Sequence, residues 1–372
     1  MNVLHVHSGN MFGGVERMLQ ALAPRIAGTS PVASSYALCF EGRTADALRA
    51  EGGTVHRLGT VRARRPDEIR RARRALRGVL ERERPDVAIV HSAWSQAIFG
   101  SAILDDGTPL VRWLHSPQPG PRWLEAWAAL SRPSLILCNS RYTLETAAGR
   151  PADVPSVVMY PPAVPLTASS GSRSAVRNAF GTPDTAVVVM LAARLEAGKG
   201  HAQLIDALAA LESSRWEAWI VGGVQQEAES AYLAALQKQA VEAGASARVR
   251  FLGERTDIAE LLSAADVYCQ PNVAPDSFGL SFVEALASGL PVITTRLGGA
   301  PEIVDDTCGI LVPPGGAVQV TAALRALIDD DGRRARLAAA ARARARTFCD
   351  VQGSVGRLAE VLSRGEHSVA LA

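Results

Sequence analysis

The chain has 372 residues, of which 48% are hydrophobic, and its 39 basic and 37 acidic side chains leave a net charge of +2. A chain of this length exceeds one ordinary core, so two domains are expected. The balanced charge gives no general reason to expect nucleic acid as a partner. The five cysteines are scattered and form no C-x-x-C or Cys/His cluster, which favours free thiols in a reducing, cytoplasmic compartment.

The chain starts directly with a strand-like pattern, without the basic and apolar regions of a signal peptide. No apolar run approaches the roughly 18–20 residues that a membrane span needs. We therefore expect a cytoplasmic protein.

Short apolar runs alternate with helical patterns in the first part of the chain, which is the βαβ rhythm of a doubly wound parallel sheet. The predicted strands are residues 3–6, 87–90, 110–114 and 135–138. A proline-rich break at 160–165 and a polar stretch at 169–172 predict a hinge.

The rhythm restarts beyond the hinge, which predicts a second α/β domain. Its predicted strands are residues 186–192, 218–222, 249–253, 267–269 and 291–295, and terminal helices follow over 324–362. The predicted domains are Rossmann-like units at 1–165 and 166–347, facing each other across a cleft.

Ligands of open parallel sheets lie beyond the carboxyl ends of the strands, so the loops that follow strands are the candidate sites. The first such loop, residues 9–17, contains Gly13 and Gly14 and opens a helix. Glycines there let a phosphate approach the backbone. The spacing is not G-x-G-x-x-G, which argues against a dinucleotide. An ordinary tight turn is the alternative.

A second candidate loop places Arg194 and Lys199 directly after the first strand of the second domain. Arginine offers phosphate a bidentate fork and lysine a compact charge, so the pair is suited to neutralising a diphosphate without a metal. The loop is not a P-loop, and a solvated loop is the alternative.

The most informative segment is 275–286, where a polar loop carrying Asp276 leads into a helix carrying Glu284. The N–H groups of Gly279, Leu280 and Ser281 stand between the two acids, at a helix N-terminus that favours phosphate. Acids that accept hydroxyl hydrogen bonds on either side of an anion site suit a ligand with both sugar and phosphate. A later turn at 298–299 is interpreted as structural.

Three histidines, His7, His91 and His115, each close a predicted strand of the first domain. The topology brings them to one edge, where a structural hydrogen-bonding role is the alternative to function. No two of them share a helix face or a short loop, so a metal site is not expected.

An arginine-rich segment runs from Arg62 to Arg77, with its apolar residues on one helical face and the arginines on the other. A solvated helix face is the simplest interpretation, and weak peripheral contact with an anionic membrane is the alternative.

Taken together, these motifs resemble those of the family-4 glycosyltransferases, retaining enzymes of the GT-B fold. The matching segments, in chain order, are 13–16, His115, 139–140, Arg194 to Gly200, 251–253, 278–285 and 289–292. One departure is Asp276, which stands where the family usually has Glu and reaches about one methylene less; a second is 160–162, where many relatives have Pro-Asn-Gly.

The resemblance implies that a nucleotide diphosphate sugar, such as a UDP- or GDP-sugar, binds mostly to the second domain, with no cofactor and no metal. Arg194 and Lys199 would hold the diphosphate, aided by Gly13, Gly14, Leu280 and Ser281. Glu284 would accept the ribose hydroxyls, and Asp276 with the backbone of Phe278 and Gly279 would hold the sugar.

His115 would lie near the reacting carbon, so the catalytic set is His115, Arg194, Lys199 and Asp276. A small-molecule, lipid or glycan acceptor would lie against the first domain, and residues 348–372 would return to it.

Two other functions use the same residues: a GT-B sugar phosphorylase or nucleotide-sugar epimerase, and a non-catalytic nucleotide-sugar-binding module. The Ala- and Arg-rich composition is typical of a GC-rich bacterial genome. The sequence leaves open the base, the sugar and the acceptor.

Overall fold

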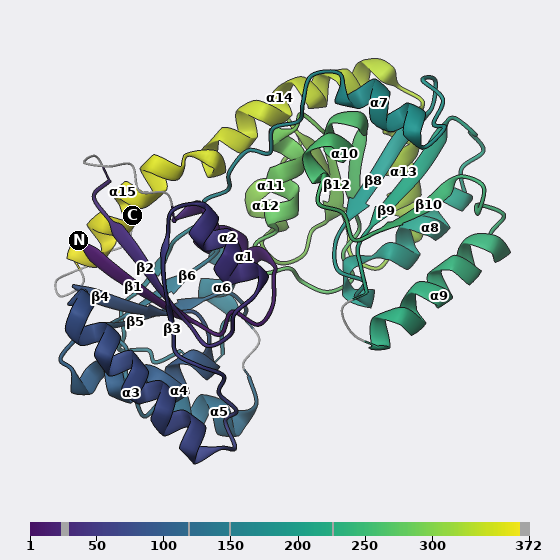
Figure 1. Cartoon of the computed structure of the whole chain (residues 1–372). Helices are drawn as coiled ribbons and strands as arrows, with labels where there is room; N and C mark the ends of the chain where they lie inside the picture. Colours follow the sequence, from purple (N-terminus) through teal and green to yellow (C-terminus); the bar gives the residue numbers. More distant parts are fainter. Residues whose placement is uncertain (24–29, 118–119, 149, 225–226, 365–372) are drawn as a thin grey trace. The chain divides into compact units, whose positions relative to one another are not determined.

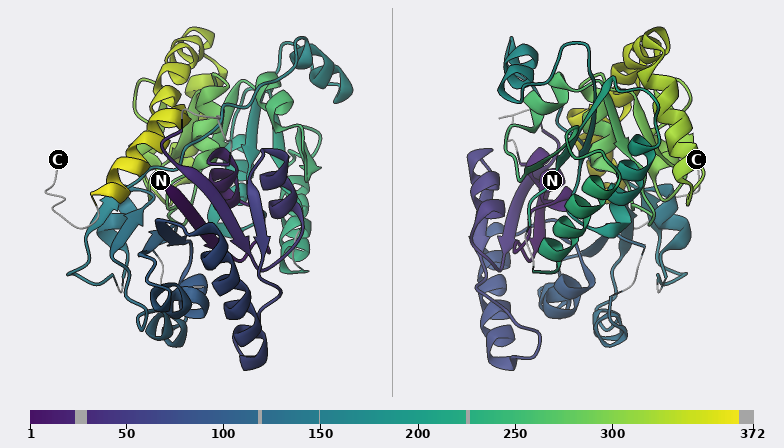
Figure 2. Two further views of the ribbon diagram at one scale, coloured as in Figure 1. Left: turned by 60° about the vertical axis from the view of Figure 1, so that its left-hand side comes forward. Right: turned by 90° about the vertical axis from the view of Figure 1, so that its right-hand side faces the viewer.

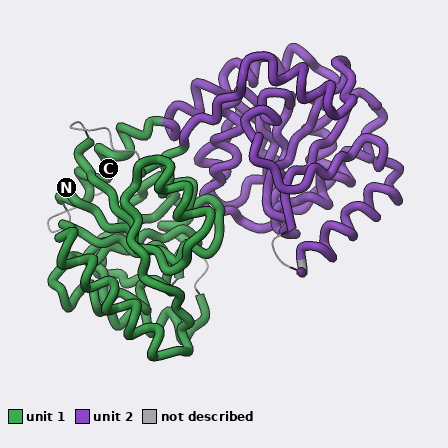
Figure 3. Tube along the Cα trace, viewed as in Figure 1, with its two compact units in different colours: residues 1–163, 350–372 green, residues 164–349 purple. Residues whose placement is uncertain are grey.

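The computed structural model describes residues 1–23, 30–117, 120–148, 150–224 and 227–364. The chain divides into two compact units, shown in different colours in Figure 3. Unit 1 comprises residues 1–163 and 350–372, and unit 2 comprises residues 164–349. Residues 365–372 of the segment expected to return to the first domain lie outside the described residues.

Unit 1 contains a seven-stranded parallel sheet in the order β3-β2-β1-β4-β5-β6-β7 (Figure 1). Its strands are β1 (Asn2–His7), β2 (Ala33–Leu38), β3 (Thr54–Arg57), β4 (Val87–Val90), β5 (Leu110–Leu114), β6 (Leu135–Cys138) and β7 (Ser156–Val158). Its helices are α1 (Gly14–Ala21), α2 (Arg43–Ala50), α3 (Pro66–Glu83), α4 (Ala93–Asp105), α5 (Arg122–Ala128), α6 (Arg141–Thr146) and α15 (Val351–Ser363).

Alternation along the strands gives the unit 1 sheet two apolar faces. Val3 of β1 packs in one buried cluster with Met18 of α1, whereas its neighbour Leu4 packs in another with Leu76 of α3. The first cluster also contains Leu358 of α15, so the last described helix packs on the sheet of unit 1 (Figures 1 and 2). Helices therefore cover both faces.

Unit 2 contains a six-stranded parallel sheet in the order β10-β9-β8-β11-β12-β13. Its strands are β8 (Val187–Ala192), β9 (Trp216–Val221), β10 (Val249–Gly253), β11 (Val267–Gln270), β12 (Val292–Thr295) and β13 (Gly309–Val312). Its helices are α7 (Ser172–Ala179), the short 3₁₀ helix η1 (Ala197–Lys199), α8 (His201–Ala209), α9 (Glu227–Glu242), α10 (Ile258–Ala264), α11 (Leu280–Ala287), α12 (Ala300–Ile303), α13 (Ala317–Ile328) and α14 (Asp331–Cys349).

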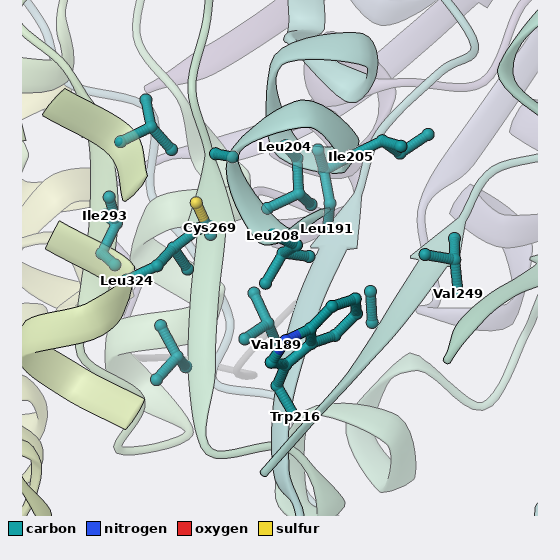
Figure 4. Packing of buried hydrophobic residues seen from close by; sticks show 14 of the residues in the cluster. Val189, Leu191, Leu204, Ile205, Leu208, Trp216, Val249, Cys269, Ile293 and Leu324 are labelled. Atoms are coloured by element: carbon teal, nitrogen blue, oxygen red, sulfur yellow. The ribbon is translucent and has the colours of Figure 1, made fainter. Parts of the chain in front are cut away.

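In the core of unit 2, alternate residues of the central strand β8 pack against helices that cover the sheet (Figure 4). Val189 and Leu191 of β8 pack with Leu204 of α8, Leu324 of α13 and the fully buried ring of Trp216. Burying each of these aliphatic side chains contributes about 1.5–3 kcal/mol. These contacts hold the carboxyl end of β8, where the candidate site begins.

The predicted doubly wound α/β fold is confirmed, and the strand order of each unit reverses once, between β1 and β4 and between β8 and β11. Such a switch point is where open α/β sheets bind ligands. The five cysteines are free, as predicted. None of the helices that the structure describes is both long and apolar enough to cross a bilayer.

The prediction that the arginines of α3 all lie opposite its apolar face is wrong for Arg73. Its guanidinium is partly buried and donates to the backbone carbonyls of Ile98 at 2.5 Å and Ala97 at 3.2 Å, at α4. A long side chain can reach from one face of a helix to the backbone of a neighbouring helix, which the helical spacing alone does not reveal. Arg70, Arg71, Arg74 and Arg77 are exposed, as expected.

Candidate active site

Three loops of unit 2 pack backbone against backbone at the switch point, and glycines permit this approach. A Cβ on Gly200 would lie 2.0 Å from the carbonyl oxygen of Pro271, and one on Gly298 would lie 2.0 Å from that of Asp276. Both glycines have positive φ, +80° and +62°. The N–H of Gly299 donates to the Asp276 carbonyl at 2.8 Å. The loops after β8, β11 and β12 therefore form one packed group.

Helix α11 begins within this group. Its N-cap, Gly279, has φ of +109°, and a Cβ there would lie 2.4 Å from the ring of Phe282. Leu280 and Ser281 open the helix, and the first N–H groups of a helix have no acceptor within it. Those groups carry partial positive charge, so this terminus suits an anion.

The hydroxyl of Ser281 is held by a buried polar network that the sequence analysis missed. Ser281 Oγ donates to Gln270 Oε1 at 3.2 Å, and Tyr268 Oη donates to the same oxygen at 2.8 Å. Gln270 Nε2 donates to Asn272 Oδ1 at 2.9 Å. Burial raises the pKa of Tyr268, which keeps its phenol protonated. The available signal was that Gln270 and Asn272 are amides at the carboxyl end of β11.

The two predicted cations of unit 2 each pair with a carboxylate. Lys199 Nζ lies 2.7 Å from Asp276 Oδ2, and both side chains are about one-fifth exposed. The exposed Arg194 pairs with Glu196. The structure thus brings Lys199 and Asp276 together across two loops, and the net positive charge of this group is smaller than the two cations alone suggest.

Glu284 and Phe278 complete the predicted set in unit 2. Glu284 follows Ser281 by three residues on α11, which places both on the same face of the helix, and it is half-buried. Phe278 is buried, and its ring meets that of Phe348 edge-on with centroids 5.7 Å apart. Phe278 therefore anchors the loop to α14, and its backbone is the part suited to a ligand.

In unit 1, the glycine loop after β1 is tied to a histidine by one buried carboxylate. Glu16 Oε2 accepts from the N–H of Gly13 at 2.8 Å, and Glu16 Oε1 lies 2.8 Å from His7 Nε2. Burial by itself raises the pKa of Glu16, but the bonds from His7 and the backbone hold it below its ordinary value. Gly14, the first residue of α1, is exposed.

His5, His91 and His115 form a chain of rings across three adjacent strands. His5 Nδ1 lies 3.0 Å from His91 Nε2, and His91 Nδ1 lies 2.9 Å from His115 Nε2. Burial lowers the pKa of His5 and of His115 to about 3, and that of His91 well below its ordinary value. The three rings are therefore neutral near pH 7. Among the described residues, no group of three or more His, Cys, Asp or Glu side chains is arranged to hold a metal ion.

Both halves of the chain match models of sugar-transferring proteins. Residues 12–166 match "Glycosyltransferase Family 4" and residues 172–344 match "Glycosyl transferases group 1". The crystal structure of Anabaena HepE in complex with UDP superposes with a TM-score of 0.84 and 26% identity, over 98% of this chain and all of that one. HepE has also been solved with UDP-glucose. The chain belongs to the family-4-like glycosyltransferases of the GT-B fold.

Curated relatives carry related names. The D-inositol 3-phosphate glycosyltransferase of Xylanimonas cellulosilytica is 31% identical over 73% of this chain and 65% of that protein. A GDP-mannose-dependent monoacylated alpha-(1-6)-phosphatidylinositol monomannoside mannosyltransferase of Corynebacterium glutamicum is 33% identical over 47% of each. The match thus spans less than two-thirds of the length of these relatives.

The predicted site residues fall into two sets, one in each unit. Unit 1 holds Gly13, Gly14 and His115. Unit 2 holds Arg194, Lys199, Asp276, Phe278, Gly279, Leu280, Ser281 and Glu284. Each set lies in loops or helix starts at the carboxyl ends of strands beside a switch point. The set in unit 2 combines cations, a helix N-terminus and carboxylates within one packed group of loops.

We expect Gly298→Ala to destabilise unit 2 more than Gly315→Ala does. Both glycines have positive φ, but a Cβ at Gly315 meets nothing within 4 Å, whereas one at Gly298 meets the Asp276 backbone. Gly315→Ala, the control, should lower the unfolding free energy by about 1 kcal/mol, and Gly298→Ala should lower it by about 3 kcal/mol or more. Urea denaturation measures both, and equal costs would show that the loops are not closely packed there.

We also expect the histidine chain to make unit 1 less stable in mild acid. Below about pH 6.5 the unfolded chain binds protons at these histidines, whereas His5 and His115 stay neutral in the folded state until about pH 3. Unfolding free energy should therefore fall from pH 7 to pH 5.5, by about 1 kcal/mol for each histidine. His5→Leu should reduce that fall by one histidine's share. Urea titrations at both pH values test this, and an unchanged fall in the variant would contradict it.

Proposed function

We propose that this chain transfers a glycosyl group from a nucleotide diphosphate sugar to an acceptor hydroxyl, with retention of the anomeric configuration and without a metal ion. The observation that carries the proposal is the packed group at the switch point of unit 2. There, Lys199 contacts the Asp276 loop and the N-terminus of α11 follows directly. The name of the GDP-mannose-dependent relative and the UDP-bound HepE structures support the same class of donor.

In this proposal the diphosphate lies at the start of α11. The N–H groups of Leu280 and Ser281 donate to phosphate oxygens, and Arg194 and Lys199 supply positive charge as the diphosphate leaves. These fixed charges perform the role that a divalent cation has in other transferases. Glu284, one turn along α11, accepts from the ribose hydroxyls.

The transferred sugar is proposed to lie beside Asp276 and the backbone of Phe278 and Gly279. Gly14 of unit 1 would donate to phosphate, Gly13, whose N–H is held by Glu16, would let the phosphate approach the backbone, and His115 would lie beside the reacting sugar. Retention then follows from attack on the face that the diphosphate leaves, with a phosphate oxygen taking the proton of the acceptor hydroxyl. A new glycosidic bond forms as the bond to the phosphate breaks, and no side-chain nucleophile is needed.

The two named relatives suggest where to look for the acceptor. One is named for inositol 3-phosphate and the other for a phosphatidylinositol monomannoside. We therefore propose a hydroxyl of a phosphorylated polyol, free or lipid-linked, as the first acceptor class to test.

A donor panel with matched lysine variants tests the proposal. One of the UDP-, GDP-, ADP- or dTDP-sugars should raise the melting temperature and be consumed when an acceptor is present. Lys199→Ala should lower kcat/KM by roughly 10²–10³-fold, about 2–4 kcal/mol of transition-state stabilisation. Lys238→Ala, at an exposed lysine on α9, should leave it unchanged. Stabilisation by NAD instead of any nucleotide sugar, or full activity of Lys199→Ala, would sink the proposal.

We further propose that unit 1 contacts an anionic membrane surface through α3. Four arginines, Arg57, Arg71, Arg74 and Arg82, line a hollow of about 640 Å³ between β3 and α3. Val55, Ala75 and Val79 also line it. Clustered cations beside apolar surface suit a lipid headgroup region.

Vesicle sedimentation tests this contact. Binding to phosphatidylcholine vesicles should require added phosphatidylglycerol and should weaken with salt. Replacing Arg74 and Arg82 by Ala should weaken binding by about 2 kcal/mol, at about 1 kcal/mol for each cation. Replacing the exposed Arg333 and Arg336 of α14 removes the same charge and should change little. Equal losses in both double variants would show that only net charge matters.

A further inference from the structure

The histidine chain of unit 1 has a buried end and an outer end. His5 lies within β1, His91 directly follows β4 and His115 directly follows β5, and these three strands are neighbours in the sheet. His5 and His91 are buried, whereas His115 is only partly buried. Successive rings stack with centroids 5.2 Å apart, and the fully buried ring of Trp113 stacks on His91 and His115. The rings therefore have little freedom to turn.

Two neutral arrangements of protons satisfy both ring-to-ring hydrogen bonds. In the first, His5 Nδ1–H donates to His91 Nε2, and His91 Nδ1–H donates to His115 Nε2, so the remaining proton of His115 lies on Nδ1. In the second, every donor becomes an acceptor, His5 carries its proton on Nε2 and His115 Nδ1 has none. A neutral imidazole has one donor and one acceptor. The nitrogen that carries the proton at His5 therefore determines which nitrogen is protonated at His91 and at His115.

The buried end decides between them. His5 Nε2 is buried and has no hydrogen-bond partner among the described residues. The first arrangement leaves a bare lone pair there, whereas the second buries an N–H without an acceptor. Unsatisfied buried N–H groups are the rarer of the two in folded proteins.

We propose that His5 and His91 are positioning residues that set the tautomer of His115, so that its Nδ1 carries a proton and acts as a hydrogen-bond donor. The chain makes His115 Nε2 an acceptor, and therefore His115 is not a general base through either nitrogen. The partner of the Nδ1–H rests on the proposed function: it is a hydroxyl or ring oxygen of the donor sugar.

The buried carboxylate of Glu16 belongs to a separate pair. His7 lies edge-on to His91 with centroids 6.0 Å apart, but its Nε2 meets Glu16. The Glu16 carboxylate therefore acts on His7 and on the Gly13 N–H, while the chain from His5 to His115 consists of imidazole rings alone.

Selective ¹⁵N labelling of histidine in the full chain tests the proposal directly. Long-range ¹H–¹⁵N correlation spectra distinguish a protonated from a bare ring nitrogen, and His115→Gln identifies the His115 signals. Near pH 7 we expect a protonated Nδ1 and a bare Nε2 at His115. A proton on Nε2 of His115 would overturn the proposal, whatever the variants do.

Two substitutions at the buried end separate tautomer control from packing. His5→Asn keeps an N–H donor near the position of Nδ1 and should preserve the His115 signals. His5→Asp replaces that donor by an acceptor, so His91 should carry its proton on Nε2, His115 should shift toward the Nε2–H form, and kcat/KM should fall roughly tenfold. His115 signals that are the same in His5→Asp as in the unsubstituted chain would overturn the proposal.

The labelling experiment needs no substrate, so it fails independently of the proposed function. The expected tautomer in a chain that turns over no donor would support the histidine chain and reject the glycosyl transfer. Glycosyl transfer by a chain whose His115 Nδ1 carries no proton would support the proposed function and reject the proposed tautomer.

Discussion

The candidate site depends on the close approach of three loop backbones in unit 2. Only glycine fits at Gly200 and Gly298, because a Cβ at either would lie 2.0 Å from a carbonyl oxygen of the loop after β11. This packing places Lys199 from one strand end against Asp276 from the next, 2.7 Å apart. It also fixes the turn from which α11 starts. Charge, helix terminus and carboxylate are thus placed by backbone contacts rather than by long side chains.

The Lys199–Asp276 contact changes how the charge of the site is understood. The carboxylate orients the lysine but also offsets its positive charge. The helix N-terminus therefore contributes a larger share of the attraction for a diphosphate. The family usually has Glu at position 276, and the shorter Asp still reaches the lysine here. The carboxylate that sequence reasoning assigned to the sugar therefore has a second role, as a partner that positions a cation.

The sequence was sufficient for the fold class, because strands buried on both faces are short apolar runs between turn residues. Residues 87–90, 110–114, 135–138 and 249–253 are strands with the predicted bounds. Strand β2 was missed because its sequence, ASSYAL, is not an apolar run, although five of its six residues are buried, two of them serines. Strand β3 was missed because it is a four-residue strand at the edge of the sheet, with mixed polarity.

The candidate site residues could be predicted as a set because strand ends meet at a switch point, but their partners could not. The pairing of Lys199 with Asp276 joins two different loops, and the pairing of Ser281 with Gln270 joins helix α11 to the end of strand β11, and both separations depend on backbone packing. The hydrogen bond between His5 and His91 could not be predicted from the sequence for a related reason. His5 lies inside a strand, where alternation predicts only burial, and its bond to His91 depends on the strand order β1-β4.

The two units would supply different kinds of chemistry to one reaction. Unit 2 offers charges, which suit the leaving diphosphate, whereas the partners that unit 1 offers around His115 are neutral rings. A mechanism in which a phosphate oxygen takes the acceptor's proton needs no base from the protein, and a base beside the sugar would compete for that proton. A histidine held neutral, with its proton on Nδ1, can orient the sugar without competing, because neither nitrogen is available as an acceptor. The tautomer chain and the proposed route of the proton are therefore consistent with each other on physical grounds.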